Sequence, residues 1–244
     1  MKIRFLGTSH GVPLPGRHCQ SVLIETEQGD YLFDAGAPVM DILIDEGYDM
    51  SRLKAAFISH CHPDHFFGLV HMLDLSSWYY YKAMEYSVYM PEQRGIDMLR
   101  AFCGEIHKLS DKVSYKLIEE GTFYNDGNVR VTAVHTDHMV NSTNISFGFL
   151  IEGEGKRVYI TGDLHPSLED FPEALLAEHT DALVTECAHF PAEDLLGKLK
   201  KVSADKIMVI HVHPSSRYDD LRKQNTGPCQ LPILYPNDND IYIV

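Results

Sequence analysis

A dense group of metal-binding side chains follows a short apolar run, and it constrains the fold more than any other feature of this sequence. Residues 55–58 (AAFI) are typical of a buried strand, because the run is short and bounded by polar residues. The next seven residues, 59–65 (SHCHPDH), place three imidazoles and a carboxylate within six positions. We expect these groups on a loop at the edge of a sheet, where neutral imidazole and carboxylate can converge on a metal. One histidine among 14 would carry little information, but four ligand-type residues at this spacing predict a site.

The spacing His60-x-His62-x-Asp64-His65 resembles the signature motif of the metallo-β-lactamase superfamily, whose members are mostly binuclear metallohydrolases. The alternation of apolar strands and helices predicts an α/β fold. The resemblance implies the more specific αβ/βα sandwich, in which two mixed sheets are flanked by helices. Composition does not shift along the chain, and we find no repeat or linker. We therefore predict a single metallo-β-lactamase-like domain over residues 1–244.

Composition narrows the classes of partner and compartment. The net charge of −14 disfavours a long nucleic acid as a partner, whereas a small anionic substrate remains compatible with it. No run of eighteen apolar residues and no charged-then-apolar leader is visible, so we expect neither a membrane span nor a signal peptide. The five cysteines form no CxxC pair and no even framework, which favours a reducing cytoplasm.

Apolar patterns and turn residues predict further elements along the chain. Residues 2–6 are expected to form an edge strand that opens the domain. The other expected strands are 22–24 and 31–33 as a hairpin, 87–90, 113–118, 128–134, 146–152 and 157–160 as a second hairpin, and 207–210. Helices are expected from Pro38 to Gly47, over 68–73, around 96–103 and after Pro191.

The resemblance implies three more metal ligands, each placed just after a predicted strand. His138 matches the single ligand histidine that follows a strand in the family, with His135 as the runner-up. Asp163, in the turn after residues 159–160, matches the carboxylate that bridges two metals. The last ligand is either His211 or His213, and we favour His211 because it lies directly at the end of the strand.

The resemblance thus implies two divalent metal ions, with zinc favoured and manganese or iron left open. His60, His62 and His138 would bind the first metal, Asp64, His65 and His211 the second, and Asp163 would bridge them. Two such cations acidify a water to hydroxide near neutral pH and stabilise the oxyanion that follows. Asp34, in the Asp-x-Gly of residues 34–36, is expected to support this loop through hydrogen bonds rather than to bind metal.

Weaker similarities point to one branch of the superfamily. The Gly- and Pro-rich loop of residues 7–21 resembles the opening of ribonuclease Z. The segment 183–190 is similar to phosphodiesterase branches, in which a Glu after a strand and a nearby His serve the leaving group. This similarity implies that Glu186 is a supporting residue and that His189 is a catalytic candidate, together with Asp64. A helix-capping or solvated role for His189 is an equal alternative. His213, Arg217 and Tyr218 resemble the ribonuclease Z tail and are candidates for substrate binding.

We therefore predict a binuclear metal-dependent hydrolase that acts on a small phosphodiester. No clear insertion for an arm that grips transfer RNA is present, which disfavours ribonuclease Z activity itself. Hydrolysis of a lactone or thioester is the alternative within enzymes, and a metal-bearing binding or sensor protein is the alternative outside them. The aromatic cluster of residues 78–81 (WYYY) serves either a substrate pocket or a homodimer surface, and the sequence leaves both open.

Overall fold

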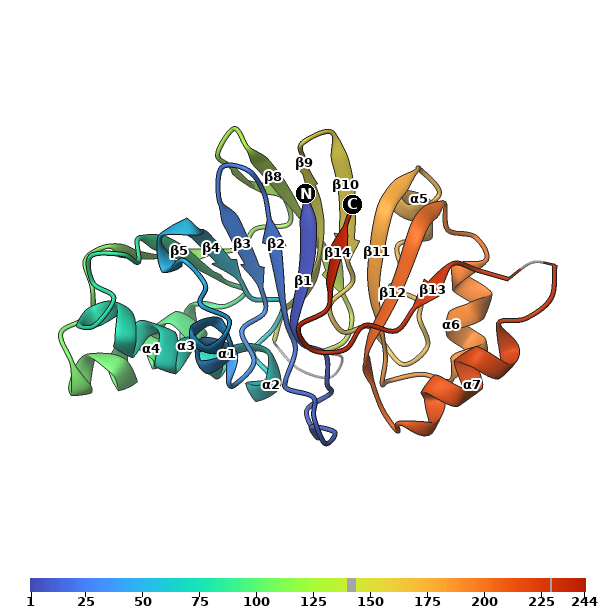
Figure 1. The fold of residues 1–244 in the computed structure, drawn as a ribbon, viewed down its shortest axis with the longest axis horizontal. Coiled ribbons are helices and arrows are strands. Elements are labelled where there is room, and N and C mark those ends of the chain that lie inside the picture. Colours follow the sequence, from blue (N-terminus) through green and yellow to red (C-terminus); the bar gives the residue numbers. More distant parts are fainter. Residues whose placement is uncertain (140–143, 229) are drawn as a thin grey trace. The chain divides into compact units, whose positions relative to one another are not determined.

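The computed structural model describes residues 1–139, 144–228 and 230–244, so Cys229 lies outside the described residues. The chain divides into two compact units (Figure 1). The first comprises residues 1–119 and 237–243, and the second comprises residues 120–236 and Val244. Each unit contains one mixed sheet with helices of its own. Over the described part of the chain, no helix is long and apolar enough to cross a membrane.

The described residues of the first unit form a seven-stranded sheet in the order β14-β1-β2-β3-β4-β5-β6. The predicted hairpin is confirmed as β2 and β3, which pair antiparallel. The expectation that the first strand forms an edge is wrong, because β14 pairs antiparallel with β1 along its outer side. Strands β3, β4 and β5 run parallel, so their carboxyl ends reach the same edge of the sheet. The strands are β1 (Lys2–Gly7), β2 (Ser21–Glu25), β3 (Asp30–Phe33), β4 (Leu53–Phe57), β5 (Tyr86–Met90), β6 (Val113–Leu117) and β14 (Ile241–Ile243).

Helices of the first unit pack on one face of this sheet and close a hydrophobic core (Figure 1). Leu32, Ala56 and Val88 from three neighbouring strands meet Leu69 and Leu99 from two helices in that core. The predicted helices after Pro38, over 68–73 and around 96–103 are confirmed. The helices are α1 (Val39–Asp45), the 3₁₀ turn η1 (Met50–Arg52), α2 (Pro63–Phe66), α3 (Gly68–Ser77) and α4 (Gln93–Ile106).

The described residues of the second unit form a seven-stranded sheet in the order β13-β12-β11-β10-β9-β8-β7. The second predicted hairpin is confirmed as β9 and β10, and β7 with β8 forms another antiparallel pair. Strands β10, β11 and β12 run parallel, so their carboxyl ends also share one edge. The strands are β7 (Gly121–Asn125), β8 (Val129–Thr136), β9 (Ser146–Gly153), β10 (Lys156–Ile160), β11 (Thr180–Cys187), β12 (Ala204–Val212) and β13 (Ile233–Leu234).

The helices of the second unit follow its parallel strands. The predicted helix after Pro191 is confirmed as α6, which buries Leu195, Leu196 and Leu199. The helices are α5 (Glu173–Leu176), α6 (Ala192–Leu199) and α7 (Ser216–Gln224). The predicted fold class, two mixed sheets flanked by helices, is confirmed. The description of residues 1–244 as a single domain stays a prediction.

Candidate metal centre

The first unit gathers four predicted ligands just beyond the carboxyl end of β4, and we call His60, His62, Asp64 and His65 the first ligand group. His60 and His65 are fully buried, whereas the side chain of Asp64 is 15% exposed. The expected loop is only partly a loop, because Pro63 begins the short helix α2, which carries both Asp64 and His65. Proline suits the first turn of a helix because its fixed φ is helical and its missing N–H would have no partner there. A helical turn brings these two side chains close to the histidines that precede it.

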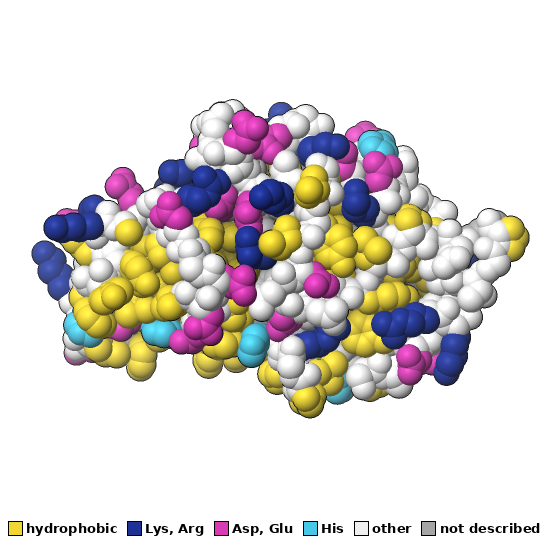
Figure 2. Space-filling view, in the orientation of Figure 1, with side chains coloured by type: hydrophobic (Ala, Val, Ile, Leu, Met, Phe, Trp, Pro, Cys, Tyr) yellow, Lys and Arg dark blue, Asp and Glu magenta, His cyan; other side chains and the backbone are white. Residues whose placement is uncertain are grey.

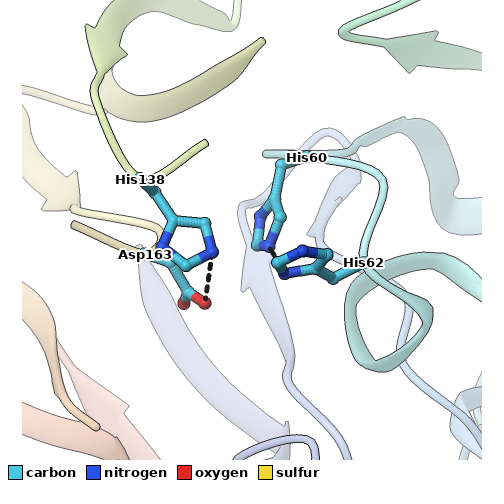
Figure 3. Close-up of side chains that lie close together, drawn as sticks. All are labelled: His60, His62, His138 and Asp163. Carbon is cyan, nitrogen blue, oxygen red and sulfur yellow. Dashed lines mark hydrogen bonds and ion pairs between the residues drawn. The ribbon is translucent and has the colours of Figure 1, made fainter. Parts of the chain in front are cut away.

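Distances within the first ligand group suit shared coordination. Nε2 of His60 lies 2.9 Å from Nδ1 of His62, and the two rings point toward each other (Figure 3). Nε2 of His65 lies 3.5 Å from Oδ2 of Asp64. Two ligand atoms that each lie about 2 Å from a tetrahedral zinc are roughly 3.3 Å apart. The donor types and these spacings therefore fit a divalent metal.

Asp34 organises the first ligand group through buried hydrogen bonds, as the sequence predicts. It follows β3, which is parallel to β4, and its φ of 57° is one that Asp tolerates better than most residues. Its carboxylate accepts hydrogen bonds from Ser59 N–H (2.8 Å), the Ser59 hydroxyl (3.0 Å) and Gln20 Nε2 (2.9 Å). Nδ1 of His65 lies 2.8 Å from the same carboxylate. If that nitrogen donates, Nε2 of His65 keeps its lone pair for a metal.

Cys61 lies inside the motif but does not belong to the ligand group. Its sulfur faces Gly95 of α4, where an added Cβ would lie 3.2 Å away. Burial, and to a smaller extent the charge of Glu92, raises the pKa of this thiol to about 12. Metals bind the thiolate, so a thiol that stays protonated at neutral pH is a poor ligand.

The second unit carries the other three predicted ligands, His138, Asp163 and His211, which we call the second ligand group. Asp163 and His211 come from the shared carboxyl edge of β10, β11 and β12, and both are buried. Oδ2 of Asp163 lies 3.4 Å from Nε2 of His211 and 3.7 Å from Nε2 of His138. Figure 3 shows the imidazole of His138 directed at that carboxylate. These distances are again those expected between atoms that share a metal.

The two residues that compete with predicted ligands are placed differently from them. The His135 side chain is 46% exposed, whereas that of His138 is 7% exposed. His211 is fully buried and adopts a φ of 50°, which for a non-glycine residue is uncommon and is found most often at functional sites. His213 is partly exposed and follows the end of β12. This geometry brings His211, rather than His213, to Asp163 among the contacts described.

Glu186 and His189 form a tightly bonded pair after β11. The buried Glu186 carboxylate accepts hydrogen bonds from the backbone N–H groups of Leu164 (2.7 Å), Ala188 (2.8 Å) and His189 (3.2 Å). It also lies 2.8 Å from Nδ1 of His189. Nε2 of His189 in turn lies 3.9 Å from Oδ2 of Asp163. The pair therefore presents a fixed imidazole beside the second ligand group.

The candidate substrate-binding residues Arg217 and Tyr218 lie in helix α7. Arg217, near the start of the helix, is hydrogen-bonded to backbone carbonyl groups of another segment. Its guanidinium donates to the carbonyl oxygens of Cys187 and Ala188. Tyr218 is buried and packs edge to face on Tyr235, with 5.8 Å between ring centroids. These contacts hold the turn that carries His189, and a role in substrate binding stays a prediction.

Three residues of the site were not singled out from the sequence. Gln20 and Ser59 bond to Asp34; they lie within segments that the sequence marks, but nothing there assigns them this contact. The carboxylate of Asp170 accepts from the backbone N–H groups of Asp137 (2.8 Å) and His165 (2.9 Å). These two groups adjoin the positions of His138 and Asp163, so Asp170 ties the two ligand-bearing segments of the second unit together.

Comparison with families of known proteins identifies the chain. The model of the family described as "Anti-Pycsar protein Apyc1" matches residues 1–231. The chain belongs to this family. Its members share with it the region that contains both ligand groups, the Glu186–His189 pair and helix α7.

Curated relatives of this family member are ribonucleases. Ribonuclease BN of Citrobacter koseri is 33% identical over 165 residues, which cover 64% of this chain and 51% of the relative. Ribonuclease Z of Listeria innocua is 29% identical over 160 residues, with 64% and 51% covered. Ribonuclease Z of Thermosynechococcus vestitus is 32% identical over 161 residues, with 64% and 38% covered. The chain thus spans about half the length, or less, of these relatives.

Solved structures confirm the fold. The short form of human tRNase Z superposes with a TM-score of 0.78 at 20% identity and covers 100% of this chain and 99% of the relative. YhfI of Bacillus subtilis, a metallo-β-lactamase fold protein, gives 0.78 at 18% identity, with 99% of both chains covered. A diphosphatase of the PhnP family gives 0.78 at 16% identity, with 100% and 97% covered. These structures confirm the predicted metallo-β-lactamase fold, and the sequence relatives support the resemblance to the ribonuclease Z branch.

Proposed function

We propose that this protein is a binuclear metal-dependent phosphodiesterase that hydrolyses a small phosphodiester. The observation that carries the proposal is the Asp163 carboxylate, on which Nε2 atoms of His138, His189 and His211 converge within 3.9 Å. One buried carboxylate beside the imidazoles of His138 and His211 is a donor set that suits a divalent cation. Family membership supports joining it with the first ligand group around one pair of metals.

The proposal gives each ligand group a defined part. His60, His62 and His138 would hold one metal, Asp64, His65 and His211 would hold the other, and Asp163 would contribute to both. When bound, the two cations supply an acidified water and stabilise negative charge on the phosphate. We take zinc as the resident metal, with manganese and iron as alternatives that the same ligands accept.

Glu186 and His189 supply the proton for the leaving group in this proposal. Because Nδ1 of His189 faces the Glu186 carboxylate at 2.8 Å, the imidazole is held in one orientation with Nε2 toward Asp163. An imidazolium in that position donates its Nε2 proton to the departing oxygen, and Glu186 stabilises the charged form. Asp64 remains a second catalytic candidate because its carboxylate, 15% exposed, is open to solvent.

The substrate in this proposal is small and anionic, such as a cyclic or mononucleotide diester. The net charge of −14 works against wrapping a long polyanion, although the curated relatives are named as ribonucleases. The chain also spans about half or less of their length, so their activity on RNA does not transfer with the match. We also infer a reducing cytoplasmic setting, since the four cysteines in the described residues are free thiols.

A homodimer is the quaternary state that we propose, through an apolar surface over α3 and α4. Figure 2 shows hydrophobic side chains gathered on the first unit over these helices. Side chains between 38% and 66% exposed make up this α3–α4 surface: Phe67, Trp78, Tyr79, Tyr81, Met98, Phe102 and Ile106. At roughly 150–250 Å² for a whole aromatic side chain, they expose roughly 700 Å². A standard interface takes about 800 Å² from each partner.

Metal analysis and a substrate panel test the catalytic proposal. Freshly purified protein is expected to carry close to two equivalents of transition metal, measured by elemental analysis. It should hydrolyse bis(p-nitrophenyl) phosphate and cyclic mononucleotides, lose this activity with chelator and regain it with zinc or manganese. Asp163→Ala should abolish it. Turnover of acyl-lactones or thioesters, without turnover of phosphodiesters, would favour a lactone or thioester hydrolase. Bound metal with no turnover of any of these substrates would favour a metal-bearing binding or sensor protein. Absence of metal, with no uptake of added zinc or manganese, would refute the binuclear site.

A further inference from the structure

The loop of residues 8–18 is closed at its base by a carboxylate from the far end of the chain. Oδ1 of Asp238 accepts hydrogen bonds from Thr8 N–H (2.9 Å) and from the Thr8 hydroxyl (2.6 Å). Oδ2 of Asp238 accepts from His18 N–H (2.6 Å). Ser9 N–H also donates to the His18 carbonyl (2.8 Å), so both ends of the loop are held together. One carboxylate thus spans the entry and the exit of this loop.

Arg17 adds a second link between the loop and the same C-terminal segment. Its guanidinium donates to the Thr8 hydroxyl oxygen (2.6 Å) and to Oδ1 of Asn237 (2.7 Å). The segment itself is anchored on β1, where Phe5 N–H donates to the Asp240 carbonyl at 3.0 Å. All of these groups belong to the first unit. The loop is therefore fixed to the turn of residues 237–240, which is itself hydrogen-bonded to β1.

The tip of the loop lies against a proposed metal ligand. A Cβ atom placed on Gly11 would lie 3.0 Å from Oδ2 of Asp64, so the Gly11 backbone directly borders that carboxylate. Next to the tip, Val12 is 62% exposed. The loop forms a wall beside Asp64.

We propose that Asp238 is a positioning residue that holds the loop of residues 8–18 against Asp64 as a preformed wall of the substrate site. This inference rests on the proposed function, and it adds a residue and a loop that the ligand motif does not contain. No residue of the loop belongs to either ligand group, so we expect the loop to act on substrate binding rather than on metal binding. A loop that is in place only part of the time weakens apparent affinity by the fraction of time it is competent.

The test is Asp238→Asn, which keeps the side-chain size but replaces one acceptor oxygen with a donor group. If the freed loop is in place about a tenth of the time, KM for bis(p-nitrophenyl) phosphate rises about tenfold. We expect kcat within about twofold of wild type, unchanged zinc content, and faster hydrogen exchange in residues 9–18. Asp49→Asn is the matched control, because this carboxylate also accepts from a backbone N–H and a hydroxyl, those of Ser51 at 3.1 Å and 2.7 Å, in the turn that precedes β4. It should change none of these quantities.

Arg17→Leu is a second variant that removes the outer link and leaves the β1–β14 pairing intact. It should shift KM and hydrogen exchange in the same direction as Asp238→Asn, by a smaller factor. Unchanged exchange in residues 9–18 of Asp238→Asn would overturn the inference, as would a freed loop with unchanged KM or a loss of zinc. If wild-type protein turns over no phosphodiester, the proposed function fails, and hydrogen exchange alone then decides whether Asp238 holds the loop.

Discussion

Replacing Asp34 with Asn should weaken zinc binding without touching a proposed ligand. In the wild type, Oδ2 of Asp34 lies 2.8 Å from Nδ1 of His65, 2.9 Å from Gln20 Nε2 and 3.0 Å from the Ser59 hydroxyl. Oδ1 accepts from Ser59 N–H. An asparagine that keeps its oxygen toward Ser59 N–H must turn its NH₂ toward these other donors. To accept a hydrogen bond from this NH₂ group, Nδ1 of His65 must lose its proton, and the ring then carries its proton on Nε2, the atom proposed to bind metal.

The size of the effect follows from this change of tautomer. Residues that orient a ligand histidine typically contribute about 10–100-fold to metal affinity. We expect zinc affinity to fall by that factor in Asp34→Asn, equivalent to about 1.4–2.7 kcal/mol. Competition with a chromophoric chelator measures the affinity directly. Far-ultraviolet circular dichroism at the same protein concentration shows whether the variant remains folded.

Asp30→Asn separates the effect on the site from the loss of a buried carboxylate. Asp30 is also buried, and its carboxylate accepts from Arg52 Nε (2.8 Å) and the Tyr48 hydroxyl (2.9 Å), with no histidine among its described hydrogen-bond partners. That variant should unfold at a lower temperature and keep wild-type zinc affinity. Zinc affinity within about twofold of wild type in folded Asp34→Asn would refute the argument, and equal losses in both variants would show that the effect is not specific to His65.

Three further predictions concern the last ligand, alkaline stability and the α3–α4 surface. His211→Ala should lose one metal equivalent and all turnover, whereas His213→Ala should keep both metals by elemental analysis; metal loss from His213→Ala alone would move the ligand. Burial raises the pKa of Tyr115 to about 12, so its contribution to stability is complete below about pH 10, where the unfolded phenol ionises, and is lost as pH rises toward 12. Tm should therefore fall across that window and less steeply in Tyr115→Phe; equal slopes would contradict this. Phe102→Glu should convert a dimer into a monomer by light scattering, and a wild-type monomer at all concentrations would contradict the proposed surface.

The ligand-type residues within 60–65 could be predicted from their spacing, whereas the family resemblance was needed to imply His138, Asp163 and His211 as ligands. His60 follows β4 and Asp163 follows β10, and both strands were predicted within a few residues of their ends. In parallel strands, carboxyl ends meet at one edge, so polar residues placed after them converge. Asp34 follows the same logic one strand earlier, and its bonds to Ser59 match the supporting role predicted for it.

Short and polar elements escaped prediction for physical reasons. Strands β13 and β14 span two and three residues, which are too few to show an alternating apolar pattern. The error about β1 follows directly, because the strand that covers its edge begins at Ile241, more than two hundred residues later in the chain. Helix α7 buries only Tyr218 and Leu221, so most of its surface is polar and its apolar period is weak. Such elements form because a sheet or core already exists to receive them.

Two supporting carboxylates, Asp170 and Asp238, are the part of the site that local pattern cannot supply. They accept hydrogen bonds from groups far away in the chain, 33 residues for Asp170 and Asp137 and 230 residues for Asp238 and Thr8. Each is one of 35 acidic residues with no spacing that marks it, whereas Asp34 stands in the Asp-x-Gly of residues 34–36. A candidate ligand can be recognised from its position after a strand. A supporting carboxylate, by contrast, must accept a hydrogen bond from a particular N–H group that only the folded chain places beside it. The candidate ligands therefore stand in short motifs that follow strands, whereas the contacts that would hold them in position exist only in the folded chain.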